Sequence, residues 1–174
     1  MRFLRLVSTA LTAMALVMAL APTTLGAAGQ RTVQILDNCD GPSFNQAIGP
    51  GTCARAGGLP YGTFFGQLAR GGAQSWRFAP ERVKLATGGT IKAINRGGEF
   101  HTFTEVANFG GGCVPPINAE LGLVAVPECA GAPGIFMATG VAPGASRTTA
   151  PLSAGTHRFM CLIHPWQQTT ATVG

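Results

Sequence analysis

From Gln74 onward the chain is a series of short segments in which apolar and polar residues alternate, with glycine and proline between them. Alternation with a period of two places every second side chain on one face, as in a strand with one buried face. Several short strands separated by turn signals predict an all-β fold, an antiparallel sandwich. The segments are QSWRFAP, ERVKLAT, GTIKAIN, FHTFTEV, GIFMATG, ASRTTAPL and THRFMCL.

The section before these segments has a different pattern. Thr32–Leu36 is a candidate for one short strand, and the spacing of Phe64, Phe65 and Leu68 predicts a short helix over 63–70. Gly71 and Gly72 provide an end for that helix. We therefore expect an N-terminal extension, 29–73, that packs a helix against the sheet, and one β-domain over 74–174.

The N-terminus has the layout of a secretory signal peptide. Arg2 and Arg5 precede an apolar run over 6–21, and small residues follow it. That run is shorter than the roughly 20 residues that a spanning helix needs. The sequence predicts a signal peptide over 1–27, cleavage after Ala27 or Ala28, and a secreted or periplasmic protein with no later membrane span. A single N-terminal anchor is the alternative.

Net charge argues against nucleic acid as a partner. Without Arg2 and Arg5, ten basic residues face seven acidic ones, a net charge of +3. The basic residues are scattered, without the clustered patch that nucleic-acid binding normally shows. We interpret them as a solvated surface.

The chain has five cysteines, an odd number. An exported protein can form disulfides. Because disulfides use cysteines in pairs and five is odd, one thiol must be left over or pair with another chain. Cys39 and Cys53 flank one loop rich in glycine and proline, and Cys113 and Cys129 flank another. Four cysteines allow three pairings, of which we favour the sequential one; each bridge would stabilise the fold by roughly 3 kcal/mol. Cys161 is then the free thiol, either buried and inert or retained for its chemistry.

Alternation assigns the faces of the last predicted strand. His157, Phe159 and Cys161 share one face, and Arg158 and Met160 share the other. We interpret His157 as a strand-end residue with a hydrogen-bond partner rather than as a metal ligand.

Two segments taken together resemble the cupredoxin family. FAPERVKLATGGTIKAINRGGEFHTF is similar to a cupredoxin segment in which F-x-P leads into two strands, an asparagine, and a histidine six residues later, here Asn95 and His101. GTHRFMCLIHPW resembles the closing strand and its C-x-x-H loop, with a spacing most like that of amicyanin. The resemblance covers about residues 76–170, apart from the loop between Cys113 and Cys129. It implies a Greek-key β-sandwich.

The same resemblance implies that His101, Cys161 and His164 are the three equatorial ligands of one type 1 copper per chain. Two imidazoles and a thiolate in a trigonal arrangement suit copper that cycles between Cu(I) and Cu(II). The function implied is single-electron transfer by an exported monomer, with an unidentified redox protein as its partner and no enzymatic activity.

The axial position departs from the amicyanin-like pattern. Relatives of that type have methionine three residues after the histidine, whereas this sequence has Gln167. Gln167 resembles the axial glutamine of stellacyanin, whose harder amide oxygen favours Cu(II) and lowers the reduction potential. The alternatives are that Gln167 points away, leaving a three-coordinate or degraded site, or that a shifted loop uses Gln168.

Three further residues are candidates for supporting roles. Asn95 would tie the histidine-bearing loop to the cysteine loop, and Thr102 lies where relatives have a polar residue near the thiolate. Trp166 would belong to an apolar docking surface around His164. Each has a structural alternative. Asn95 and Thr102 could be ordinary turn or strand residues, and Trp166 could be a ring packed at the mouth of the barrel.

Other functions use the same residues. A module for copper carriage, sequestration or sensing would need the same ligands, and so would a zinc site. A fourth interpretation is a cupredoxin-fold domain that has lost copper. A multicopper oxidase is excluded because three histidines cannot build a trinuclear cluster, and a cysteine hydrolase lacks an evident oxyanion-hole motif.

Overall fold

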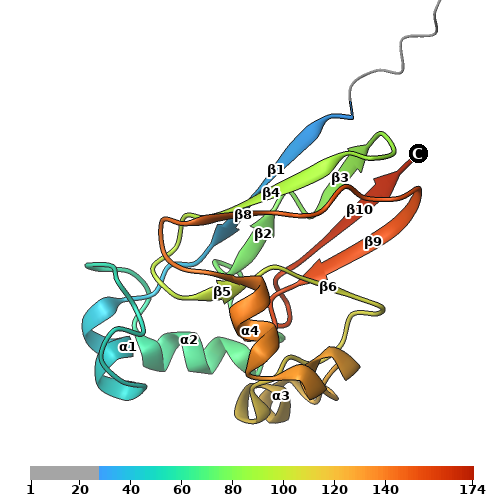
Figure 1. Cartoon of the computed structure of the whole chain (residues 1–174). Helices are drawn as coiled ribbons and strands as arrows, with labels where there is room; N and C mark the ends of the chain where they lie inside the picture. The colour runs from blue at the N-terminus through green and yellow to red at the C-terminus, as the bar shows by residue number, and fades with distance from the viewer. Residues whose placement is uncertain (1–27) are drawn as a thin grey trace, which may run out of the picture.

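The computed structural model describes residues 28–174, so the predicted signal peptide lies outside the described residues. Two four-stranded sheets form a sandwich, and a two-stranded sheet lies at one end. The helices gather at that same end (Figure 1). The predicted β-sandwich is therefore confirmed, and its helical end is where the site is found.

The first sheet contains a strand from the N-terminal section. β1 pairs in parallel with β4 and antiparallel with β2, so it is an interior strand. The segment that we expected to precede the β-domain thus supplies part of its sheet. In spatial order the strands are β2 (Arg77–Ala79), β1 (Gln30–Leu36), β4 (Thr90–Asn95) and β8 (Ser146–Thr148).

The second sheet ends the chain. Its β10 pairs in parallel with β3 and antiparallel with β9. The strands in spatial order are β3 (Arg82–Leu85), β10 (Gln168–Val173), β9 (Gly155–Met160) and β6 (Thr104–Val106), and the small sheet pairs β5 (His101–Thr102) with β7 (Gly140–Val141).

The expectation of a purely antiparallel sandwich needs correction, because both large sheets are mixed. Parallel partners need long connections, and more than fifty residues separate β1 from β4. β10 was not among the predicted segments, although it alternates: Thr169, Ala171 and Val173 are buried. A threonine-rich strand has a weak apolar period, which explains the omission.

Side chains from both sheets form the core between them. Val33 and Ile35 of β1 pack in one cluster with Phe159 of β9 and Ala171 of β10. Phe103 stacks on Phe159 with ring centroids 4.7 Å apart. Each large apolar side chain buried here stabilises the fold by roughly 1.5–3 kcal/mol. Because Cys161 belongs to the same cluster, the core fixes its position.

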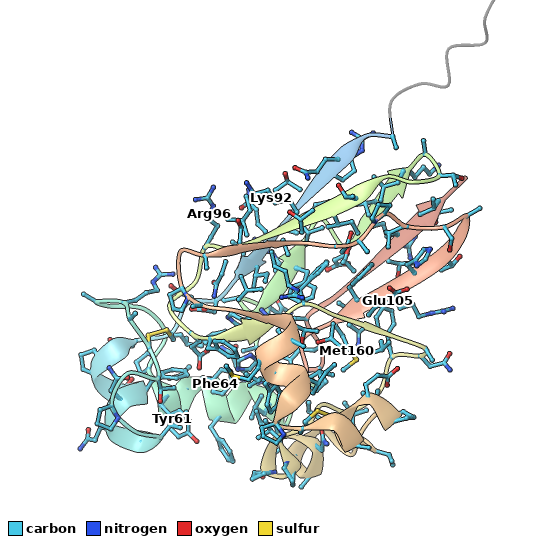
Figure 2. All side chains as sticks on the ribbon, viewed as in Figure 1. Tyr61, Phe64, Lys92, Arg96, Glu105 and Met160 are labelled. Atoms are coloured by element: carbon cyan, nitrogen blue, oxygen red, sulfur yellow. A yellow bond between two sulfur atoms is a disulfide. The ribbon has the colours of Figure 1, made fainter. Side chains whose placement is uncertain are left out.

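Within residues 28–174, four α-helices and one 3-10 helix cover the end of the sandwich. The predicted helix over 63–70 is present as α2 but starts two residues earlier, directly after Pro60. Figure 2 shows its residues Tyr61 and Phe64 at this end, and Met160 where β9 reaches it. No helix within 28–174 has the length and apolarity to cross a membrane. The helices are α1 (Gly41–Ala47), α2 (Tyr61–Leu68), α3 (Pro115–Leu121), η1 (Pro127–Gly131) and α4 (Gly134–Thr139).

GIFMATG, predicted as a strand, forms helix α4 instead. Ile135 and Phe136 both pack on the cluster around Met160 and Leu162. Adjacent residues of a helix can contact the same cluster, whereas adjacent residues of a strand point to opposite faces. The Thr139 hydroxyl donates to the carbonyl of Ile135, 2.7 Å away, within the helix. A short apolar run does not distinguish strand from helix, and packing decided the outcome.

The sequential disulfide pairing is confirmed. Cys39 is bonded to Cys53 and Cys113 to Cys129, while Cys161 is free and buried. The second bridge lies against the site, since the N–H of Cys113 donates to the carbonyl of Leu162, 2.6 Å away. Both bridges thus hold loops at the helical end.

Candidate metal centre

Three predicted ligands meet at the helical end. His101 lies in β5, Cys161 follows β9, and His164 lies in the loop before β10, and all three side chains are buried. The Sγ atom is 3.8 Å from each Nδ1, and the two Nδ1 atoms are 3.2 Å apart. A point equidistant from these atoms lies about 2.1 Å from each, within the ~2.0–2.3 Å range of metal bonds to nitrogen and sulfur. One metal ion therefore fits between them.

The surroundings of the sulfur at this site favour its thiolate form. Burial alone would raise the pKa of Cys161, but hydrogen bonds with His101 and His164 and the charges of these residues bring it well below its ordinary value. The backbone N–H of Thr102 also points at Sγ, 3.4 Å away. A thiolate is the form of cysteine that binds metal.

Backbone hydrogen bonds shape the loop that carries two of the ligands. The N–H of Cys161 donates to the carbonyl of Gln167, 3.1 Å away, and the N–H of Gln167 donates to the carbonyl of His164, 2.9 Å away. The hydroxyl of Thr102 accepts from the N–H of Leu162 at 2.8 Å. Thr102 thus joins the strand of His101 to the loop of Cys161. This contact positions the donor atoms in the metal-free protein.

Asn95 has a different role from the one expected. Its side-chain amide donates to the carbonyls of Glu99 and Val141, at 2.7 and 2.9 Å, and its oxygen accepts from the N–H of Gly97. It therefore shapes the turn before His101 and ties it to β7. The link to the cysteine loop is made by Thr102, whose hydroxyl accepts from the N–H of Leu162.

Gln167 is fully buried beside the ligand loop. Its amide nitrogen donates to the carbonyl of Leu36, 2.9 Å away, which fixes the orientation of the amide. Within residues 28–174 its Oε1 atom is buried and has no hydrogen-bond partner. A buried acceptor without a hydrogen-bond partner lowers the stability of the fold. Such an atom is expected where it binds a ligand.

A buried carboxylate that sequence reasoning missed faces His101. Asp37 Oδ2 lies 2.8 Å from His101 Nε2, and neither side chain is exposed. The carboxylate also accepts from the backbone N–H groups of Cys39, Gly98 and Glu99. Asp37 directly follows β1, and its side chain accepts from the N–H two residues further on, a common local use of aspartate, so the sequence carried no distinguishing signal.

This contact changes the charge state of both groups. Burial would raise the pKa of Asp37, but the hydrogen bonds from His101 and the backbone hold it well below its usual range. Burial would lower the pKa of His101, but its bonds to Asp37 and Cys161 raise it to about 10. Near neutral pH the metal-free protein therefore favours a protonated His101 between Asp37 and Cys161.

A second buried carboxylate, also missed, faces His164. Glu99 Oε2 lies 3.7 Å from His164 Nε2 and accepts the indole N–H of Trp76. Burial raises the pKa of Glu99, although the charge of His164 opposes the shift. Each of the two candidate ligand histidines thus has a carboxyl group on its Nε2 side, an arrangement that in metal sites orients a histidine and makes it a more basic ligand.

Trp166 is packed rather than free. Its indole N–H donates to the carbonyl of Ala73, 3.0 Å away, and its ring lies 5.5 Å from His164 and 6.2 Å from Phe64. The ring sits directly over Gly72, whose φ is +112° and where a Cβ atom would come within 2.6 Å. Trp166 and α2 together cover the edge of His164.

His157 lies outside the metal cluster, as expected. Its Nδ1 is 2.6 Å from Glu105 Oε1, and its Nε2 is 2.9 Å from the carbonyl of Ser153. The predicted hydrogen-bond partner is therefore present.

Solved structures similar to this chain are cupredoxins. A purple cupredoxin from Nitrosopumilus maritimus is 12% identical over 83% of this chain and 99% of its own, with a TM-score of 0.43. A mutant plastocyanin of fern is 14% identical over 82% and 99%, with a TM-score of 0.40. A reduced Cu(I) form of an amicyanin mutant is 18% identical over 59% and 76%, with a TM-score of 0.37.

No protein-family model matches the sequence, and no curated protein matches it.

Proposed function

We propose that this protein binds one copper ion through His101, Cys161 and His164 and transfers single electrons. The observation that carries the proposal is the buried triangle of two Nδ1 atoms and one Sγ, 3.8, 3.8 and 3.2 Å apart. Thiolate sulfur suits Cu(I) and imidazole suits Cu(II), so this donor set accommodates both states. Copper, when bound, supplies the one-electron chemistry.

Gln167 is the axial ligand in this proposal. Its buried Oε1 has no partner within the described residues, and the bond from its amide nitrogen to Leu36 leaves the oxygen as the free end. An amide oxygen is a harder donor than a thioether and favours Cu(II). The buried carboxylates of Asp37 and Glu99 act in the same direction, so we expect a low reduction potential.

The surroundings of the triangle support electron transfer over metal carriage. Carriage requires ligand exchange at an accessible ion, whereas all three ligand side chains here are buried. Hydrogen bonds to Asp37 and Thr102 hold the donors in one arrangement, and little rearrangement favours a rapid change of oxidation state. Zinc would bind the same donors but has no redox chemistry.

The proposed location is outside the cytoplasm, in the secreted or periplasmic fraction. Two disulfides support it, because such bonds persist in oxidising compartments. We propose that the protein acts as a monomer with a redox protein as partner, and that it carries out no chemical conversion of its own.

Copper reconstitution tests the proposal. Cu(II) added to the purified mature protein should give an intense visible thiolate-to-copper absorption at one copper per chain, and Cys161→Ser should abolish it. Met160→Leu, a buried neighbour outside the triangle, is the matched control and should keep the colour. A colourless wild-type protein without stoichiometric copper would refute the assignment.

A further inference from the structure

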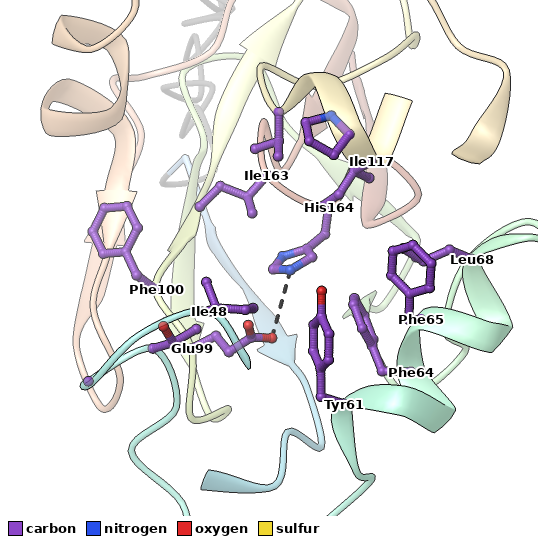
Figure 3. Close-up of a pocket in the computed structure, with 14 residues that line it drawn as sticks. Ile48, Tyr61, Phe64, Phe65, Leu68, Glu99, Phe100, Ile117, Ile163 and His164 are labelled. Atoms are coloured by element: carbon purple, nitrogen blue, oxygen red, sulfur yellow. Dashed lines mark ion pairs between the residues drawn. The ribbon is translucent and has the colours of Figure 1, made fainter. Parts of the chain in front are cut away.

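A cavity opens beside His164. It has a volume of about 510 Å³, within the ~300–1,000 Å³ range of small-molecule sites. α2, α3 and the loop before Cys53 surround it, and the ligand loop forms one wall. Figure 3 shows the His164 ring directed into it, opposite the rings of Tyr61, Phe64 and Phe65.

Apolar surface is concentrated at this cavity. Of the large apolar side chains exposed within 28–174, Ile48, Phe65 and Phe100 line it, at 55, 41 and 40% exposure. Exposed apolar residues gathered around a hollow mark a binding site, whereas scattered ones need no explanation. Tyr61, Phe64, Phe65 and Phe100 provide aromatic faces, so a flat ring is the shape of occupant that they favour.

The polar groups lie at the His164 end. Among the described residues, Glu99 and His164 are polar side chains at this end of the cavity, and no lysine or arginine lines it. An organic acid would therefore meet the Glu99 carboxyl group without a lysine or arginine to balance its charge. Anionic occupants are disfavoured.

Glu99 decides between a neutral occupant and a cationic one. Its Oε2 atom already faces His164 and accepts the Trp76 N–H, so this oxygen is already engaged. An occupant of the cavity can still donate a hydrogen bond to the Glu99 carboxylate. A hydroxyl on an aromatic ring meets this need and leaves the rest of the molecule apolar.

We propose that this cavity binds a neutral phenol, with the ring between the aromatic side chains and the hydroxyl donating to Glu99. The bound ring then lies against His164, a copper ligand under the proposed function. Binding itself uses no metal, so it can be tested apart from that function.

Calorimetric titration of the mature protein with 4-propylphenol tests the proposal, in both the metal-free and the copper-treated form. Saturable binding is expected, with NMR shifts at α2 and at residues 99–100 and 163–164. Its methyl ether keeps the ring but lacks the donor, and should bind about tenfold more weakly. 4-Propylbenzoate and 4-propylbenzylamine should bind more weakly still. An amine or ether that binds as well as the phenol would overturn the proposal.

Phe65→Glu and Ile48→Glu place a charge at the mouth of the cavity and should each weaken phenol binding at least tenfold. Both positions are exposed, so folding should persist, which circular dichroism checks. Val124→Glu makes the same change at an 86% exposed apolar residue outside the cavity and should leave affinity within twofold. Equal affinity in all variants, or no phenol binding, would refute the cavity assignment even if the copper colour forms. Phenol binding by a protein that takes up no copper would refute the proposed function alone.

Discussion

Asp37 Oδ2 lies 2.8 Å from His101 Nε2, although the two residues are 64 positions apart in the sequence. Because the Nε2–H of His101 donates to this carboxylate, the Nδ1 atom of His101 faces Cys161 and His164. The N-terminal section therefore contributes to the candidate metal centre as well as to the sheet. Histidine ligands are commonly oriented by such partners.

Asp37→Asn should raise the reduction potential of the copper-loaded protein. The substitution removes a negative charge near the metal and keeps the shape of the side chain. Unit charges roughly 6 Å apart at an effective dielectric constant of 20 interact by about 2–3 kcal/mol, which corresponds to a shift on the order of 100 mV. Redox titration of the visible absorption measures it.

Glu81→Gln is the control for that shift. Glu81 is exposed, so solvent screens its charge, and the potential should change little. Equal shifts in the two variants would mean that net charge, rather than the contact with His101, sets the potential.

Apparent copper affinity should rise with pH. The pKa of His101 in the folded metal-free protein is about 10, so below that pH a metal must displace one proton from Nδ1. The hydrogen bonds and charges of His101 and His164 also hold the pKa of Cys161 well below its ordinary value. The affinity should increase about tenfold per pH unit as pH rises from about 7 toward 10. Competition with a chelator of known pH dependence measures this slope.

The same measurement on Asp37→Asn provides the control. Without the carboxylate the pKa of His101 falls, so the rise in affinity should end at a lower pH. A wild-type affinity that does not change between about pH 7 and 9 would contradict a protonated His101.

Gln167→Met should also raise the reduction potential. A thioether is a softer donor than the amide oxygen and favours Cu(I). The variant also loses the hydrogen bond to the carbonyl of Leu36, so thermal unfolding should show a loss of about 1 kcal/mol.

Gln168→Met is the matched control for the axial assignment. Gln168 is the next residue, half-buried, and its amide donates to the carbonyl of Pro165. Its substitution should leave the potential unchanged. A potential that responds to Gln168→Met and not to Gln167→Met would move the axial ligand by one position.

Removing the Cys39–Cys53 bridge by a double alanine substitution should cost about 3 kcal/mol of unfolding free energy, because the bridge closes a loop of 14 residues. Denaturant unfolding of the metal-free protein measures the loss. The Cys39 N–H also donates to Asp37, so the pKa of His101 should shift in an NMR titration.

The Cys113–Cys129 bridge closes a loop of similar length, 16 residues, and its removal should cost a similar free energy. This second double variant should leave the pKa of His101 unchanged. If both variants shift that pKa equally, the bridges act through general loosening and not through Asp37.

Sequence alone determined those features that local pattern encodes. Alternation identified most strands, cysteine parity isolated Cys161, and the resemblance of two segments to cupredoxins implied His101, Cys161 and His164, three side chains that the structure brings together. Such signals are readable because each depends on neighbours within one segment or on a count.

Tertiary structure decided how distant segments meet. Whether GIFMATG became a strand or a helix depended on its packing against Met160 and Leu162, and the place of β1 in the sheet depended on β4. Asp37 and Glu99 are ordinary turn and loop residues in the sequence. Only burial beside the two histidines makes them part of the centre, because a carboxylate's effect on an imidazole depends on distance and on the exclusion of water, which no local pattern records.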